Sequence, residues 1–163
     1  MAVARARSRN GRNADEVSEL DKRIIEHLQQ DGRRPFTQIA AELGVSEAAV
    51  RARTNRLVER GILQIVGVTD PLKLGFQQMA MVGIRCERDR LVSVAEEVAT
   101  FPEVDYVVIT AGTYDVLIEV VCEDNRALLD FLATRLRAIE GVRDTETFVY
   151  LRMVKQTYQW GTR

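Results

Sequence analysis

One short stretch of the sequence, RARTNRLVER, carries the arginines Arg51, Arg53, Arg56 and Arg60. Val50 and Leu57 recur around them at helical spacing and define a side that packs inward. Ala52 and Asn55 fall on the opposite side, between the longer cations. A helix with small residues at its centre and guanidinium groups at its margins can enter a major groove and reach phosphates and base edges. A solvated cationic surface is the alternative interpretation.

Charge is distributed unevenly along the chain. Residues 1–63 carry 12 Lys and Arg against 9 Asp and Glu, a net charge of +3. Residues 64–163 carry 11 against 15, a net charge of −4. Because a polyanion attracts positively charged surface, only the first part of the chain suits nucleic acid.

Three helices are predicted in this basic part. The first follows the N-cap Ser18 and stops at Asp31, and the second spans residues 36–43. The third runs from Ser46, whose hydroxyl can cap free amides, to about Arg60. Together they occupy residues 18–60, which is the size of a small DNA-binding head.

The turn between the second and third helices has the spacing of a helix-turn-helix. Ala40 is small where the two helices touch, Gly44 can adopt positive φ in the tight turn, and Val50 returns to the core. The third helix is therefore expected to enter the groove, while the start of the second crosses the duplex backbone. The candidate DNA contacts are Arg33, Arg34, Thr37, Gln38, Ser46, Arg51, Asn55 and Arg56.

The rest of the chain changes from helical to alternating periodicity. Strands are predicted over residues 77–86, 105–110, 115–122 and 145–153. Apolar stripes predict one helix carrying Leu91, Val94, Ala95 and Val98 and another carrying Leu128, Leu129, Leu132 and Leu136. The order βαββαβ predicts a ferredoxin-like sandwich with helices on one face of an antiparallel sheet.

The predicted fold class is therefore α+β: an N-terminal winged helix-turn-helix followed by a C-terminal ferredoxin-like sandwich. The wing is the apolar, β-branched stretch 62–68, which we expect to form a strand. Helices on one side leave the other sheet face uncovered, so we expect a second copy to cover it in a homodimer.

Several functional classes are excluded on composition. No apolar run approaches the ~20 residues needed to span a bilayer, and the basic N-terminus lacks the apolar stretch of a secretory signal, so a cytoplasmic protein is expected, with no membrane partner. Cys86 and Cys122 lie apart from potential metal ligands, which favours buried thiols over a disulfide or a zinc site. His27 is the only histidine, and no nucleophile–base pair or phosphate loop is recognisable, so we expect no enzyme, no metal and no cofactor.

Several separated motifs in order resemble the Lrp/AsnC family, the leucine- and asparagine-responsive regulators also called feast/famine proteins. They are LDKRIIEHLQQDGR (20–33), IAAELGVSEAAVRARTNRLVERGIL (39–63), DPLKLG (70–75), FPEV with the AGTYD turn (101–115) and GVRDTETF (141–148). The resemblance implies a winged helix-turn-helix that reads double-stranded DNA. It also implies a ferredoxin-like domain that dimerises, assembles further, often to octamers, and binds amino acids or related metabolites.

The effector-binding residues that this resemblance implies lie in one loop and one strand. Amide and hydroxyl donors there would hold the carboxylate of an amino acid, and Asp115 would accept from its ammonium group. A turn glycine and ordinary strand threonines are the alternative interpretation. The implied residues are Gly112, Thr113, Tyr114, Asp115, Thr145 and Thr147.

The predicted organisation follows from both lines of reasoning. It consists of a flexible basic tail (1–17), a helix-turn-helix DNA-binding domain (18–63), a strand and linker (64–76), a ferredoxin-like domain for effector binding and oligomerisation (77–155) and a C-terminal tail (156–163). The arginines of the basic tail either contact phosphates or stay solvated. The leading hypothesis is a sequence-specific transcriptional regulator that responds to an amino acid or related metabolite. The alternative is an architectural, chromatin-like DNA-binding protein without effector control.

Overall fold

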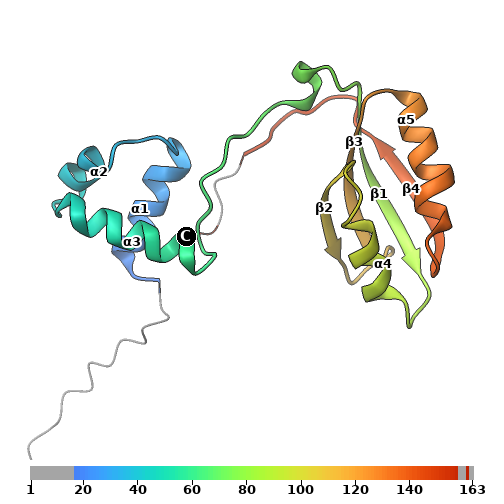
Figure 1. The fold of residues 1–163 in the computed structure, drawn as a ribbon, viewed down its shortest axis with the longest axis horizontal. Coiled ribbons are helices and arrows are strands. Elements are labelled where there is room, and N and C mark those ends of the chain that lie inside the picture. The colour runs from blue at the N-terminus through green and yellow to red at the C-terminus, as the bar shows by residue number, and fades with distance from the viewer. Residues whose placement is uncertain (1–16, 158–160, 162–163) are drawn as a thin grey trace, which may run out of the picture. The chain divides into compact units, whose positions relative to one another are not determined.

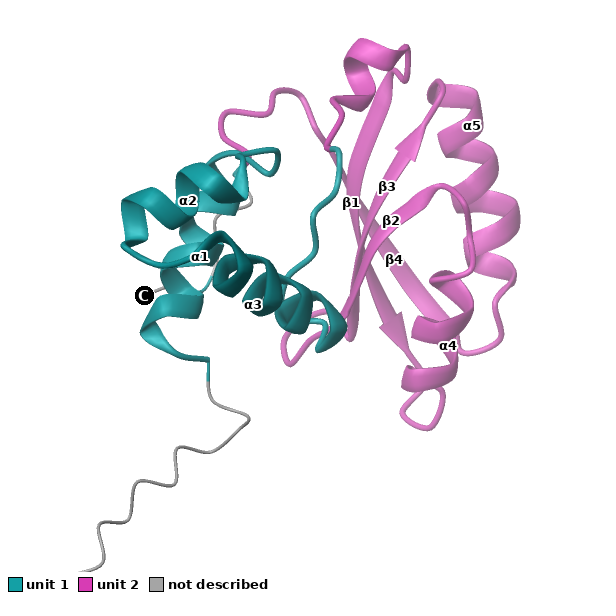
Figure 2. Ribbon diagram, turned by 60° about the vertical axis from the view of Figure 1, so that its left-hand side comes forward, with its two compact units in different colours: residues 1–67, 157–163 teal, residues 68–156 magenta. Residues whose placement is uncertain are grey.

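The computed structural model describes residues 17–157 and residue 161. The chain divides into two compact units, residues 1–67 with 157–163 and residues 68–156 (Figure 2). The basic tail predicted over residues 1–17 lies outside the described residues except for Val17, and most of the predicted C-terminal tail also lies outside them.

Three helices build the first unit: α1 (Glu19–Gln30), α2 (Phe36–Leu43) and α3 (Glu47–Glu59) (Figure 1). A capping box starts α1, in which the Ser18 side chain accepts from the Asp21 amide and the Asp21 side chain accepts from the Ser18 amide. Gly44 ends α2 at φ 68°, a left-handed conformation that costs glycine little. The three predicted helices and the glycine in the turn are confirmed.

An apolar cluster between the three helices holds α3 in place. Its buried members are Ile24, Ile25, Leu28, Ile39, Ala40, Val50, Leu57 and Leu63. Burying one such aliphatic side chain contributes roughly 1.5–3 kcal/mol. The inner side of α3 is therefore fixed by packing, and its outer side is left for other contacts.

The strand predicted as a wing over residues 62–68 does not form. In the part of the chain that the structure describes, residues 62–70 belong to no strand, and Val66 is 69% exposed. A β-branched sequence becomes a strand only when a neighbouring strand takes its N–H and C=O groups, and no described segment does so here. A 3-10 turn, Pro71–Leu74, follows, capped by the Asp70 side chain.

Four strands and two main helices build the second unit. The strands are β1 (Gln78–Cys86), β2 (Val104–Ile109), β3 (Val116–Cys122) and β4 (Val142–Val149). The helices are α4 (Leu91–Val98) and α5 (Asn125–Asp130), the latter extended by a π-helical turn (Phe131–Arg135) and a 3-10 turn (Leu136–Ala138). The sheet order is β2-β3-β1-β4 with every pair antiparallel. This is the predicted ferredoxin-like arrangement, with α4 and α5 on the same side of the sheet (Figure 2).

The register of the sheet separates two faces. Val82 lies opposite Ile118 on β3 and Thr147 on β4, and both Val82 and Ile118 are fully buried against the helices. Residues one step along each strand, such as Gly83 and Glu146, therefore point to the opposite face. We call this second side the open face, because neither α4 nor α5 packs on it.

The identity of one core residue differs from the predictions, and the bounds of the last strand differ from them by more than a residue or two at the ends. Leu129 is 65% exposed, and Phe131 is buried in its place, because a residue adjacent to buried Leu128 lies about 100° away around a helix. The last strand spans 142–149 and not 145–153, because its pairing with β1 reaches Ala80 opposite Val149 and β1 begins only two residues earlier. Among the described residues, no helix is long and apolar enough to cross a membrane.

Candidate nucleic-acid interface and ligand loop

The outer side of α3 is exposed and shallow. Val50, Thr54 and Leu57 are buried on its inner side, as predicted. On the outer side a hollow is lined by Glu47, Ala48, Arg51, Ala52 and Asn55. Small side chains at the centre of such a surface leave room for base edges.

Arg51 stands at the margin of this hollow with partners from two helices. Its Nη2 donates to Glu47 Oε1 at 2.5 Å, and its guanidinium lies 5.3 Å from the centre of the Phe36 ring. The side chain remains 59% exposed. Sequence reasoning missed Glu47, although its spacing four residues before Arg51 on one helix was a usable signal. Glu47 orients the arginine and can itself accept from a cytosine amine.

Ser46 supplies the N-cap of α3. Its Oγ accepts from the Ala49 amide at 3.2 Å, as the sequence predicted for a cap. Its hydroxyl proton is not used in that bond, so the hydroxyl can still donate to a phosphate. Its predicted contact with DNA stays a prediction.

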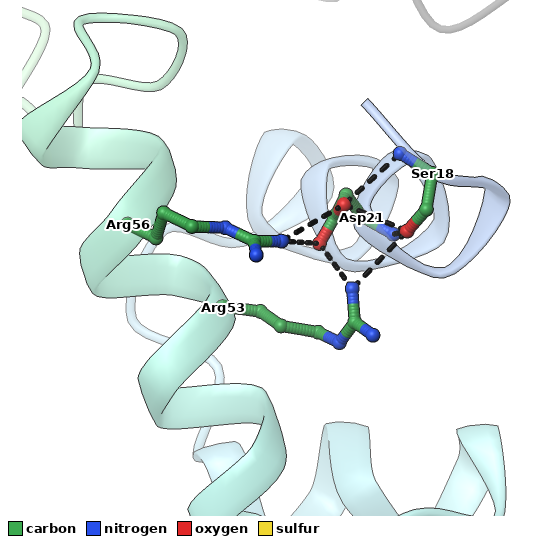
Figure 3. Close-up of polar contacts among 4 residues, drawn as sticks. All are labelled: Ser18, Asp21, Arg53 and Arg56. Carbon is green, nitrogen blue, oxygen red and sulfur yellow. Dashed lines mark hydrogen bonds and ion pairs between the residues drawn. The ribbon is translucent and has the colours of Figure 1, made fainter. Parts of the chain in front are cut away.

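Asp21, on α1, links the other two arginines of α3 to the fold (Figure 3). The side chain is 1% exposed, and its carboxylate accepts from Arg53 Nη1 at 2.9 Å and from the Ser18 hydroxyl at 2.7 Å. Arg56 Nη2 lies 3.4 Å from both carboxylate oxygens. Burial alone raises the pKa of Asp21, but hydrogen bonds from Ser18 and Arg53 outweigh it and hold the pKa below 3.8.

This carboxylate changes the interpretation of two arginines. Arg53 has a structural role and connects α3 to α1, because it also donates to Ser18 Oγ at 3.1 Å and is only 34% exposed. Arg56 was predicted to flank the outer face, and its side chain is 49% exposed, with its guanidinium drawn towards Asp21. The sequence did not indicate these contacts, because Arg53 and Arg56 lie more than thirty residues away from Asp21.

The candidate contacts at the start of α2 fall into two groups. Arg33, Thr37 and Gln38 are exposed and available to a duplex backbone. Arg34 is held inward: it donates to Glu42 Oε1 at 2.5 Å and lies 2.9 Å from His27 Nδ1, with a side chain only 19% exposed. Arg34 therefore joins α1 to α2 in the structure, and its predicted phosphate contact is not supported by its position.

The loop predicted to bind an effector lies at the edge of the open face. The Tyr114 ring packs against Gly83, and the Tyr114 hydroxyl donates to Glu146 on β4. Arg85 Nε donates to the Thr113 carbonyl at 3.2 Å, and Arg85 Nη1 to Asp144 at 3.2 Å. Gly112 and Thr113 are exposed. The sequence did not single out Arg85, Asp144 or Glu146, because the strand pairing that gathers them was unknown.

Asp115 closes this loop onto β1. Its Oδ2 accepts from the Cys86 amide at 2.8 Å, where the β1–β4 register shifts between Arg85 and Cys86. Its amide donates to the Ile84 carbonyl at 2.9 Å. Asp115 thus has a structural role in addition to the acceptor role that was predicted.

Thr145 and Thr147 do not lie with the loop within one chain. Thr145 is opposite Ile84 and Thr147 is opposite Val82, so both threonines are on the helix-covered side of the sheet. Tyr114 is on the open face. The sequence grouped both threonines with the loop in one candidate site, but the strand register does not bring them together within one chain. β1 separates β4 from β3, and alternation turns residues 145 and 147 inward.

Among the described residues, no group of three or more His, Cys, Asp or Glu side chains is placed so that it could hold a metal ion. Cys86 and Cys122 are both buried free thiols. Burial raises the pKa of each thiol, with Asp115 adding to the effect at Cys86 and Glu103 at Cys122. Burial and a raised pKa both make these thiols poor nucleophiles.

Comparison with known families agrees with this division. Residues 17–58 match the AsnC-type helix-turn-helix domain, and residues 79–160 match the Lrp/AsnC ligand binding domain. The HTH-type transcriptional regulator PH0140 of Pyrococcus horikoshii is 34% identical over 144 residues, which cover 88% of this chain and 91% of that protein. FL11 of Pyrococcus furiosus, also an HTH-type transcriptional regulator, is 32% identical over 142 residues, covering 86% and 93%.

Solved structures share the fold. E. coli AsnC superposes with a TM-score of 0.79 at 24% identity, covering 88% of this chain and 98% of that chain. A transcriptional regulator of Neisseria meningitidis in complex with L-Met gives a TM-score of 0.80 at 22% identity, covering 90% and 97%. At these identities the likeness establishes the α+β fold.

Proposed function

The chain belongs to the Lrp/AsnC family of DNA-binding transcriptional regulators, and from this we propose that it reads specific DNA sequences with the outer side of α3 and responds to an amino acid or related metabolite. Its family and its relatives are transcriptional regulators and not enzymes, and so is this chain.

The observation that carries the DNA-reading proposal is the composition of the exposed side of α3. Arg51 has the bidentate donors that match guanine, Asn55 has the amide that matches adenine, and Glu47 has the acceptor that matches cytosine. Ala48 and Ala52 between them keep the surface low enough for these groups to reach the groove floor. The exposed Arg33, Thr37 and Gln38 add backbone contacts where α2 crosses the duplex.

Selection from a random duplex pool tests this proposal. The full-length protein enriches a preferred duplex, and its affinity for that duplex is compared with its affinity for the unselected pool. Arg51→Ala and Asn55→Ala should each weaken binding to the enriched duplex by about 1–3 kcal/mol and relax the preference. Arg137→Ala removes an exposed arginine from the other unit and should change neither affinity. Wild-type preference in both α3 variants would reject the proposal.

A second copy of the chain on the open face would supply the second recognition helix. Support comes from the apolar character of that face, where Tyr106 is 51% exposed and Phe148 is 45% exposed. Two-fold pairing would place two α3 helices about one helical turn apart on a palindromic site. Sedimentation should show a dimer or a multiple of it, up to an octamer, and Phe148→Asp should shift the mass towards monomer.

We also propose that the second unit binds a small-molecule effector. The match to a ligand binding domain supports it, as do the exposed loop Gly112–Thr113 and the adjacent carboxylates Asp144 and Glu146. The Neisseria meningitidis regulator bound to L-Met makes amino acids the first class to try. Because Thr145 and Thr147 face away from the loop within one chain, their predicted role requires a neighbouring copy or a rearranged strand.

Thermal-shift screening against the common amino acids tests the effector proposal, since a ligand of the native state raises the apparent melting temperature. A hit should also change affinity for the enriched duplex, typically by ~1–3 kcal/mol of coupling. No hit, combined with binding that ignores DNA sequence, would favour an architectural DNA-binding protein instead.

A further inference from the structure

Asp21 is the one charged side chain among the described residues that is almost fully buried. Its oxygens receive five contacts: from the Ser18 amide, the Ser18 hydroxyl and Arg53, and two from Arg56 Nη2. A buried carboxylate with this many donors is held in a single orientation. Figure 3 shows Asp21 between Ser18 on one side and the two α3 arginines on the other.

The two arginines are held differently. Arg53 makes short contacts to Asp21 and Ser18, at 2.9 and 3.1 Å, and fixes the rotation of α3 about its own axis relative to α1. Arg56 is more distant, with one nitrogen, Nη2, at 3.4 Å from both oxygens. This distance exceeds the ~2.7–2.9 Å of a strong charge-assisted bond, so the contact orients the guanidinium more than it binds it. Only this nitrogen makes the contact, so the second N–H of Nη2 and an adjacent N–H group still form one free edge of the guanidinium. The side chain is half exposed.

We propose that Asp21 is a positioning residue for base readout: it aligns Arg56, and through Arg53 the whole of α3, so that the edge of the Arg56 guanidinium turned away from Asp21 is ready for a base in the groove. This inference rests on the proposed use of α3 as the reading helix. It adds a residue on α1, outside the candidate DNA contacts, that decides sequence preference.

The physical reason is the entropy of a long side chain. A free arginine loses about 2 kcal/mol of rotamer freedom when a planar, bidentate contact immobilises it. A side chain already oriented by Asp21 loses less on binding, so the gain appears as affinity for the correct base. A phosphate accepts hydrogen bonds from many directions, so the same alignment of Arg56 adds little to sequence-independent binding. The negative charge of Asp21 even weakens that binding slightly.

Asp21→Asn in the full-length protein tests the proposal, because it keeps the shape of the side chain and removes the charge that holds both arginines. Affinity for the enriched duplex should fall about fivefold, while affinity for the unselected pool should stay equal or rise. Glu26→Gln is the matched control, since Glu26 is an exposed acid on the same helix and loses the same charge; it should leave the ratio of the two affinities unchanged. A purely structural role of Asp21 requires that Asp21→Asn lose equal affinity for the enriched duplex and for the unselected pool. That result would overturn the proposal.

Arg56 provides the second test, which does not depend on the folding of an Asp21 variant. Arg56→Lys keeps the charge but lacks the planar edge, so it should lose affinity for the enriched duplex only. In an Arg56→Ala background, Asp21→Asn should lower the affinity ratio by less than it does in the wild type, because only its effect through Arg53 remains. Unchanged preference in Arg56→Lys would overturn the proposal. Unchanged preference in Arg51→Ala as well as in Arg56→Ala would instead reject α3 as the reading helix.

Discussion

The ring of Tyr114 lies directly against the backbone of Gly83 on the open face of the sheet. A Cβ added at residue 83 would lie 2.5 Å from Tyr114 Cγ and 2.6 Å from its Cδ1. Glycine is therefore required at the centre of β1 so that the aromatic ring can cross it and reach Glu146 on β4.

Gly83→Ala should accordingly lower the free energy of unfolding by about 1–3 kcal/mol, because the ring or the strand must move. Urea denaturation of the two proteins measures the difference. Gly112→Ala is the matched control: a Cβ there meets nothing within 4 Å, and its φ is not positive. Its effect should stay within about 0.5 kcal/mol.

Removal of the ring provides the internal check on this explanation. In a Tyr114→Ala background the cost of Gly83→Ala should largely disappear, since the two residues contact each other and their effects are coupled. Simple additivity of the two substitutions would show that the ring is not the cause.

Asp21 should make stability depend on acid pH. Burial alone raises its pKa, but hydrogen bonds from Ser18 and Arg53 lower it further, so the folded-state pKa is below 3.8. A depressed pKa stabilises the fold at pH values above the unfolded pKa of about 3.9, and this contribution is lost as pH falls through the folded value. Wild type should exceed Asp21→Asn in unfolding free energy by about 1–3 kcal/mol at pH 6.

Urea denaturation of both proteins at pH 6, 5, 4 and 3 checks the sign. The difference between them should be constant down to about pH 4 and shrink below it. A difference that grows on acidification would mean that Asp21 is protonated in the native state, with its two arginines unpaired.

Arg33 and Arg34 are adjacent in sequence and should behave differently. Arg34→Ala removes the contacts with Glu42 and His27 and should cost about 1 kcal/mol of stability, the modest value reflecting a partly solvated ion pair. Arg33→Ala should leave stability unchanged and reduce the salt dependence of DNA binding by about one counterion. Thermal unfolding and salt titration of binding separate the two roles, and identical profiles would contradict the assignment.

Local features of this fold could be predicted from the sequence. The caps Ser18 and Ser46, the turn glycine Gly44 and the inner side of α3 depend on neighbours within a few residues, and each was predicted where it lies. The order βαββαβ followed from periodicity, and the known architectures allow few ways to arrange it.

Features that depend on distant residues could not be predicted in this way. The pairing of Asp21 with Arg53 and Arg56 joins α1 to α3, which are separated in the sequence by α2. Neither helix alone carries a signal for this contact. The side on which Thr147 falls depends on which strand pairs with β4, and a strand at residues 62–68 requires a partner that periodicity cannot supply. The candidate effector site was therefore predicted as a set of residue types and not as a geometry.

Asp115 is the residue at which a structural and a ligand-binding role must be separated. Its Oδ2 accepts from the Cys86 amide at 2.8 Å, so Asp115→Ala leaves a part-buried donor without its partner and should cost about 1–3 kcal/mol of stability. Asp115→Asn can keep that bond through its amide oxygen while losing the negative charge. It should therefore be the more stable of the two variants by urea denaturation.

An amino acid that raises the melting temperature of the wild type then distinguishes the two roles. If Asp115 accepts from the ligand's ammonium group, the shift should fall sharply in Asp115→Asn although its fold is retained, because the amide oxygen carries no negative charge and the ion pair with the ammonium is lost. A wild-type shift in Asp115→Asn would mean that Asp115 only holds the Cys86 amide and does not bind the ligand. The ammonium would then bind Asp144 or Glu146 on β4. Asp144→Asn and Glu146→Gln, measured in the same assay, would identify which of the two it is.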